Sequence, residues 1–259
     1  MLDHLGRVCP LSQEPQRIIS LVPSITETLF ALGLKKHVVG RTRFCIHPQP
    51  AVQQVVRVGG TKQINYARLQ DLKPDLIVAE KEENTPEMIA ELEKSWPVFV
   101  AQVESIPQAH RLITDLGKLC NRRAAASKLL ANIRQKWSQV PQFTHPRSVA
   151  YYIWRDPDMV VGKGTYIQSV LERIGLENVF LSKAGRYPTL AQGDLARAKP
   201  DLVLLSSEPY PFKDKHIQEF QSQAMNARVE LVDGEMFSWY GSRMEQAATY
   251  LSRLIRSWV

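Results

Sequence analysis

Aromatic side chains are concentrated in the segments that follow the predicted strands of the second half of the chain. Loop aromatics often only pack their own loop, but several rings at one sheet edge can stack against a flat or bulky organic molecule. Seven residues have this placement: Trp154, Tyr187, Tyr210, Phe212, Phe237, Trp239 and Tyr240. The pattern predicts a stacking surface for an organic ligand.

Basic side chains lie near these aromatics in the sequence. Guanidinium and ammonium groups bind carboxylate and phosphate groups, although each alone is more often a solvated surface charge. The residues concerned are Arg155, Lys163, Arg186, Lys213 and Arg243. They are candidates for holding anionic groups of a ligand.

Catalytic motifs are weak. Residues 162–165 read GKGT, but the G-x-x-x-x-G-K-[ST] spacing of a phosphate loop is absent, as are G-x-S-x-G and H-E-x-x-H. Cys45 and His47 offer two metal ligands without a third at a set spacing. The carboxylates Asp156, Asp158, Glu208 and Glu235 can act as an acid and base pair only if folding brings them together. We therefore expect no enzyme, and keep a two-lobed α/β hydrolytic enzyme as the less favoured alternative.

Composition excludes several classes of protein. The 259 residues are 44% hydrophobic and 23% charged, and no apolar stretch is long enough to span a bilayer. The formal charge of +7 is spread along the chain, without a basic run interleaved with aromatics, so we expect no nucleic-acid partner. Cys9, Cys45 and Cys120 are far apart and predict neither a disulfide framework nor a zinc site.

The first sixteen residues, MLDHLGRVCPLSQEPQ, lack a basic n-region, an apolar h-region and a small-residue cleavage site. They do not read as a secretory signal. The expectation is a cytoplasmic protein if Met1 is the native start, or an exported one whose signal lies outside this sequence.

Strands and helices alternate in the first half, which is typical of a mostly parallel sheet covered on both faces. Ser24 and Glu27 have the spacing of a capping box, which predicts a helix start there. We expect strands at 17–21, 37–40, 55–58, 76–79 and 98–100, and helices at 26–34, 66–73 and 86–94.

The second half repeats the pattern. LKPDLIVA at 72–79 matches AKPDLVLL at 198–205, and LGL at 32–34 matches IGL at 174–176, which argues for a duplicated α/β lobe. We expect strands at 148–154, 202–205 and 229–232, and helices at 166–174, 194–199, 216–225 and 243–258.

Residues 107–137 have apolar positions at three- and four-residue steps, which predicts one amphipathic helix of roughly 46 Å. One interpretation of this helix is an ordinary surface helix of a single domain. We prefer a helical strut, with an N-terminal lobe at 1–105, a linking long helix at 106–140 and a C-terminal lobe at 141–259. Two lobes leave a cleft, and ligands of open parallel sheets bind beyond the carboxyl ends of the strands.

Several segments resemble a known family. They are RIISLVPSITETLFALGL at 17–34, VGG at 58–60, GRYP at 185–188 and the two KPD segments. They resemble the class III substrate-binding proteins of ABC importers, the helical-backbone metal receptor group, and are most similar to its cobalamin-binding branch. The resemblance covers nearly the whole chain.

The resemblance implies two Rossmann-like lobes joined by one long backbone helix, in a monomer without catalysis or an intrinsic cofactor. It implies a cobalt- or iron-containing chelate as ligand, corrinoid-like or a ferric siderophore or haem, held between the lobes by aromatic packing. It also implies an ABC permease as partner and a periplasmic or extracellular location.

The resemblance assigns cleft positions residue by residue. Phe44 stands where the cobalamin binder has a stacking tyrosine, and Thr61 where it has a tryptophan. Trp154 and Tyr187 match aromatic positions, and Arg243 matches an arginine. The full predicted ligand-binding set is Phe44, Cys45, Thr61, Lys62, Trp154, Arg155, Arg186, Tyr187, Glu208, Phe237, Trp239, Tyr240 and Arg243.

Family members dock on the permease through one surface glutamate on each lobe. Ala67 and Gly193 stand at these positions, and the nearby Asp71 and Asp194 are out of register. An alternative hypothesis is therefore a cytoplasmic relative that binds a chelate without serving a transporter.

Overall fold

Short apolar strands alternate with helices along the chain and form two separate sheets. The structure is a computed structural model that describes residues 1–11 and 13–258. The chain divides into two compact units: the first contains 1–103, 107–135 and 240–243, and the second contains 104–106, 136–239 and the chain from 244 on. The predicted fold class, α/β with two lobes and mostly parallel sheets, is confirmed.

The first unit contains a five-stranded sheet in the order β3-β2-β1-β4-β5, with every pairing parallel. The strands are β1 (Ile18–Ser20), β2 (Val38–Thr42), β3 (Val56–Gly59), β4 (Leu76–Glu80) and β5 (Val98–Ala101). Every residue of β1, β4 and β5 is buried, as expected for parallel strands covered on both faces.

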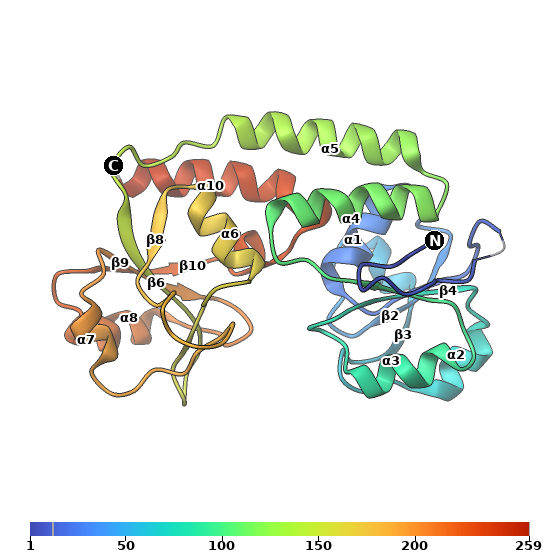
Figure 1. Ribbon diagram of the computed structural model, residues 1–259, viewed down its shortest axis with the longest axis horizontal. Helices are drawn as coiled ribbons and strands as arrows, with labels where there is room; N and C mark the ends of the chain where they lie inside the picture. The colour runs from blue at the N-terminus through green and yellow to red at the C-terminus, as the bar shows by residue number, and fades with distance from the viewer. Residues whose placement is uncertain (12, 259) are drawn as a thin grey trace. The chain divides into compact units, whose positions relative to one another are not determined.

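The helices of this unit cover the two faces of its sheet (Figure 1). They include α1 (Pro23–Ala31), α2 (Tyr66–Leu72) and α3 (Pro86–Glu93), with a 3₁₀ turn η1 (Ala51–Gln54). Leu69 of α2 and Leu92 of α3 pack in one apolar cluster with Ile19 and Ile77 of the strands. This cluster anchors both helices to the sheet, so the loops at the strand ends start from fixed points.

The second unit has strands in the order β10-β9-β6-β7, and β8 also pairs with β6. The strands are β6 (Arg147–Trp154), β7 (Met159–Val160), β8 (Leu176–Asn178), β9 (Leu202–Ser206) and β10 (Arg228–Val232). Only β7 pairs antiparallel among these described strands. The helices are α6 (Tyr166–Arg173), α7 (Asp194–Ala198), α8 (Asp214–Gln223), α9 (Glu235–Ser238) and α10 (Met244–Trp258), and η2 (Gly241–Arg243) belongs to the first unit.

The expected capping box at Ser24 and Glu27 was wrong. Helix α1 begins at Pro23, and its N-cap residue, Val22, makes no side-chain cap. Proline suits the first helical position because its missing N–H has no helical partner there in any case. Ser24 and Glu27 therefore lie inside the helix, where their side chains serve other contacts.

The prediction of one unbroken helix over 107–137 was also wrong. The segment forms α4 (Ile106–Leu119) and α5 (Arg123–Ser138), which run side by side and are joined by a tight turn (Figure 1). Asn121 makes the turn with a φ of +52°, a left-handed conformation that asparagine tolerates. The chain still passes from the first unit to the second inside a helix, because α5 crosses the boundary between Gln135 and Lys136.

Gly117 permits the close approach of α4 and α5. A Cβ atom built on Gly117 would lie 2.4 Å from the Cβ of Ala126, far inside van der Waals contact. The Arg122 amide also donates to the Gly117 carbonyl oxygen at 2.6 Å, which tightens the turn. Hydrophobic periodicity predicts the buried face of both helices but carries no signal for this reversal.

Gly117→Ala should destabilise the protein, although alanine is the better helix former. In an uncrowded helix the change would add up to about 1 kcal/mol of stability. Here we expect a loss of about 1–2 kcal/mol from overpacking against Ala126, measured by urea unfolding. The double variant Gly117→Ala, Ala126→Gly should recover most of the loss, and a single variant more stable than the parent would contradict the packing argument.

Candidate functional site

The loop after β2 presents Phe44 to solvent. Arg41 lies near the end of β2 and is only 2% exposed. Its guanidinium holds this loop in place. Its Nε donates to the Val52 carbonyl oxygen at 2.8 Å and its Nη1 to that of Cys45 at 3.0 Å. Phe44 remains 46% exposed, with the Arg43 guanidinium 4.8 Å from its ring centroid. A fixed loop thus displays an uncovered ring at the carboxyl edge of the first sheet.

Cys45, beside Phe44, lies in the core. Its Sγ is 3.1 Å from Thr26 Oγ1 and 3.2 Å from Thr42 Oγ1, and burial raises the pKa of the thiol. The observed contacts of Cys45 stabilise the start of the loop, and its role as a ligand contact stays a prediction.

A polar network closes the carboxyl edge beyond β3 and β4. Glu80 is buried at the end of β4, and its Oε2 accepts the amides of Glu82 at 2.7 Å and Glu83 at 3.1 Å. Burial raises the pKa of Glu80 to about 7. The Lys62 ammonium donates to the Glu82 carbonyl oxygen, and the Thr61 carbonyl oxygen accepts Asn84 Nδ2 at 2.9 Å.

The segment Tyr240–Arg243 adds two predicted residues to the first unit. Tyr240 is buried, and its pKa is raised by that burial and by the nearby Glu80 carboxylate, while its hydrogen bond to Ser24 opposes the shift. Arg243 is buried and donates from Nε to Glu27 Oε2 at 2.9 Å. Ser24, Glu80 and Tyr240 therefore share the edge where β1 and β4 end.

In the second unit the last residue of β6, Trp154, is 40% exposed. Its ring meets that of Tyr210 edge to face, with centroids 5.8 Å apart. The neighbouring Arg155 is neutralised by Asp158 at 2.7 Å and by Glu219. The second unit, like the first, displays one large aromatic ring beside a fixed loop.

Glu208 follows β9 and is tied to the segment after β10. Its Oε1 accepts Ser238 Oγ at 2.6 Å and Trp239 Nε1 at 2.9 Å, and burial raises its pKa. Phe237 is fully buried against Tyr151, with centroids 5.1 Å apart. A hollow of about 530 Å³ opens here, lined by Ser207, Glu208, Phe212, Leu231, Val232, Asp233 and Glu235.

The remaining predicted residues lie on other loops. Arg186 pairs with Glu104 at 2.5 Å, and Tyr187 beside it is half-buried. Ala67 is exposed on α2, whereas Gly193 caps α7 with a φ of +81°. Asp194, next to Gly193, pairs with Lys183 at 2.7 Å and with Arg197, and the Lys183 hydrogen bond leads the contacts that lower its pKa to about 2.

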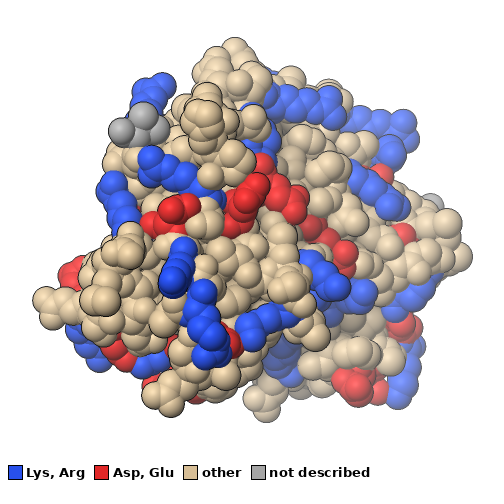
Figure 2. Space-filling view, turned by 60° about the vertical axis from the view of Figure 1, so that its left-hand side comes forward, with Lys and Arg blue, Asp and Glu red and all other residues tan. Residues whose placement is uncertain are grey.

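Lys and Arg side chains are spread over the face drawn in Figure 2, with Asp and Glu side chains among them. Within the described residues, no group of three or more His, Cys, Asp or Glu side chains is placed to hold a metal ion. In the same part of the chain, none of the helices combines the length and apolar character needed to cross a bilayer.

Sequence reasoning did not single out Arg41, Glu80 or Asn84. The sequence shows these residue types but not their partners, which are main-chain groups: the Val52 carbonyl oxygen for Arg41, the Glu82 amide for Glu80 and the Thr61 carbonyl oxygen for Asn84. The burial of Cys45 and Phe237 likewise depends on neighbours that sequence spacing does not reveal.

Glu80→Gln should change how stability depends on pH. Glu80 has a pKa of about 7 in the folded protein and an ordinary pKa of 4.5, so between these pH values the folded protein holds a proton that the unfolded chain has lost. This component of stability falls as pH rises through that window. The variant should therefore gain roughly 1–3 kcal/mol relative to the parent between about pH 5 and about pH 8, measured by urea unfolding.

Glu177→Gln, which removes an exposed carboxyl on β8, is the matched control. It should leave unchanged the difference in the free energy of unfolding between the two pH values. A Glu80→Gln variant whose stability tracks the parent at every pH would show that the carboxyl is ionised throughout the window.

Known proteins resemble the chain in sequence and in fold. A vitamin B12-binding protein from Pectobacterium atrosepticum is 23% identical over 243 residues, covering 90% of this chain and 86% of the relative. An uncharacterised ABC transporter substrate-binding lipoprotein from Bacillus subtilis is 25% identical over 269 residues, covering 98% and 84%. A periplasmic heme-binding protein from Roseiflexus, in its apo form, has the same fold, with a TM-score of 0.80, 20% identity, and 93% and 98% of the two chains covered.

The family assignment rests on a match to a family of sequences. The family described as "Periplasmic binding protein" matches residues 18–232, which run from the first strand of the first unit to the last strand of the second. The two relatives and the solved structure named above are all described as binding proteins. The chain belongs to the periplasmic binding protein family.

Proposed function

We propose that this protein binds a metal chelate, corrinoid-like in the first instance, without converting it, as the substrate-binding component of an ABC importer. The observation that carries the proposal is the presence of two exposed rings, Phe44 and Trp154, each at the carboxyl end of a strand in a mostly parallel sheet. Stacking on such a ring is worth about 1–3 kcal/mol for a flat partner. Relatives named for vitamin B12 and for heme support a large planar ligand.

The pairing of the arginines favours a ligand with little negative charge. Arg155, Arg186 and Arg243 were candidates for anionic groups, but each is already engaged by a carboxylate. Three more carboxylates, Glu208, Asp233 and Glu235, line the hollow of the second unit. A corrinoid carries uncharged amides around its ring, whereas haem carries two propionates that these carboxylates would repel. The ligand class we favour is therefore the corrinoid.

The carboxyl that a hydrolytic enzyme would use has another role. A buried glutamate with a raised pKa is a candidate general acid. Glu208 fits that description, but its Oε1 accepts two hydrogen bonds that hold Ser238 and Trp239 in place. We propose that Glu208 fixes the segment after β10 and contacts the ligand, and that the protein has no catalytic activity.

We propose an ABC permease as the partner, on the strength of the lipoprotein relative that covers nearly all of the chain. Exposed Ala67 and the backbone cap at Gly193 stand where family members use glutamates. Docking would then use other side chains of α2 and α7. The transporter-free relative is the competing form of the proposal, and recovery of the protein with a permease from detergent extracts would exclude it.

Calorimetric titration with cobalamin, cobinamide, haemin and a ferric siderophore tests the proposal. We expect saturable binding of the corrinoids, with bound ligand recovered chemically unchanged. Phe44→Ala and Trp154→Ala should each weaken binding by about 1–3 kcal/mol, because each removes a stacking platform.

Met225→Ala is the matched control, since Met225 is 82% exposed just beyond the end of α8. It should leave the affinity unchanged. Failure of all four ligands to bind, or conversion of one of them, would overturn the proposal, and preferential binding of haemin would overturn the charge argument.

A further inference from the structure

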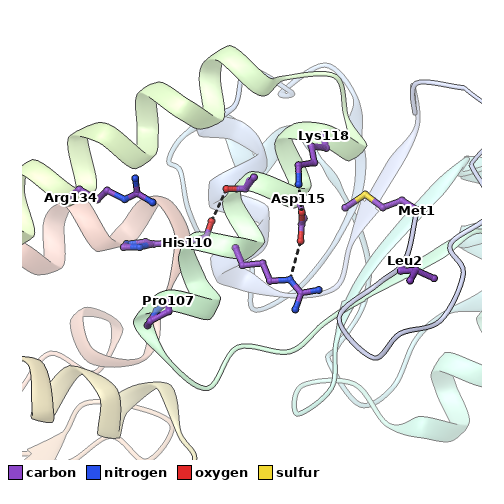
Figure 3. A pocket seen from close by; sticks show the side chains of 9 residues that line it. Met1, Leu2, Pro107, His110, Asp115, Lys118 and Arg134 are labelled. Carbon is purple, nitrogen blue, oxygen red and sulfur yellow. Dashed lines mark hydrogen bonds and ion pairs between the residues drawn. The ribbon is translucent and has the colours of Figure 1, made fainter.

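A hollow of about 580 Å³ lies in the first unit along one face of α4, beside α5 (Figure 3). Its α4 residues follow three- and four-residue steps, which place them on one side of the helix. Met1 and Leu2 close one end. None of the residues that line this hollow belongs to the carboxyl-edge set described above, so its chemistry requires its own explanation.

Positive charge exceeds negative charge in this hollow. Arg111, Lys118 and Arg134 line it, and Asp115 is the carboxylate among its lining residues. Asp115 is contacted by Lys118 Nζ at 3.1 Å, by Arg111 Nε at 3.4 Å and by His4 Nε2 at 3.3 Å. One carboxylate against three permanent cations leaves a surplus that attracts anions.

The end of the hollow at His110 and Arg134 has unused hydrogen-bonding capacity. Among the described residues His110 Nε2 is buried without a hydrogen-bond partner, and no carboxylate there forms an ion pair with Arg134. Arg134, on α5, extends toward His110 on α4, while Asp115 and Lys118 lie further along the hollow (Figure 3). A buried polar atom without a partner costs about 1–3 kcal/mol, which an incoming acceptor would relieve.

The protonation of His110 suits it to donate to an anion. Burial lowers the pKa of His110, and the positive charge of Arg134 lowers it further. The neutral ring keeps one N–H, and in the tautomer protonated at Nε2 this N–H has no hydrogen-bond partner among the described residues. Its main chain is held within α4, where Thr114 Oγ1 donates to the His110 carbonyl oxygen at 3.1 Å.

We propose that the His110–Arg134 end of this hollow binds a multivalent oxyanion of the phosphate class. The Nε2–H of His110 donates to one oxygen, and the planar guanidinium of Arg134 donates to two others, as arginine does with phosphate. Arg111 and Lys118 add positive potential without direct contact. This site is separate from the proposed chelate site, and neither depends on the other.

Calorimetric titration of the whole chain with inorganic pyrophosphate, at an ionic strength held constant with sodium chloride, tests the site. We expect saturable binding with a Kd of about 1 mM or tighter. Arg134→Gln, which removes the positive charge, and His110→Phe, which removes the N–H donor, should each weaken it at least about tenfold. Binding should also shift the imidazole resonances of His110 in the parent protein.

Lys35→Gln, which removes an exposed cation outside the hollow, is the control and should change the affinity by less than about twofold. Equal losses in Lys35→Gln and Arg134→Gln would show an adventitious ion only and overturn the proposal. So would the absence of binding, or a response only to anionic vesicles or acidic peptides. Arg134 is exposed, so its substitution tests the site without disturbing the core.

Discussion

Parallel pairing of β1 with both β2 and β4 is the constraint on which the first unit depends. The strand order reverses at β1, so the connections after β1 and β4 leave on opposite sides of the sheet, which is the position where open α/β sheets bind ligands. Ser24, Glu80 and Tyr240 lie near this position. The order of the strands determines where this position is, while its chemistry depends on the few side chains that the loops bring to it.

Buried polar groups give those loops their rigidity. The guanidinium of Arg41 is satisfied by main-chain carbonyls, and the Glu80 carboxyl by main-chain amides. Each would cost several kcal/mol if its partners were lost, because a buried charge or carboxyl without hydrogen bonds is strongly disfavoured. The same groups therefore maintain the fold of the edge and keep Phe44 in a fixed, exposed position. A pre-ordered ring binds a rigid ligand without the entropic cost of ordering a loop.

Most of the fold could be predicted from the sequence because parallel strands are continuous apolar runs. The two KPD segments marked the equivalent strands β4 and β9, and the duplication they suggested matches the two sheets. The two-residue β7 and three-residue β8 were missed because such short strands have no period of their own. The helix break at Asn121 was missed because one left-handed residue and one glycine contact decide it, and periodicity continues through both helices.

The types of residue in the candidate site could be predicted from the sequence, but the ion pairs between them could not. Arg243 and Glu27 are 216 residues apart, and Arg186 and Glu104 are 82 apart. The sequence therefore shows how many charges there are but not which of them form ion pairs. Because these arginines are paired with carboxylates, the net charge of +7 for the whole chain does not describe the charge of the loops that carry the aromatic residues. The hollow beside α4 and α5 keeps an excess of positive charge, because its lining contains three cationic side chains and one carboxylate. Charge pairing within the fold, rather than overall composition, would then direct an uncharged planar ligand and a small anion to different surfaces.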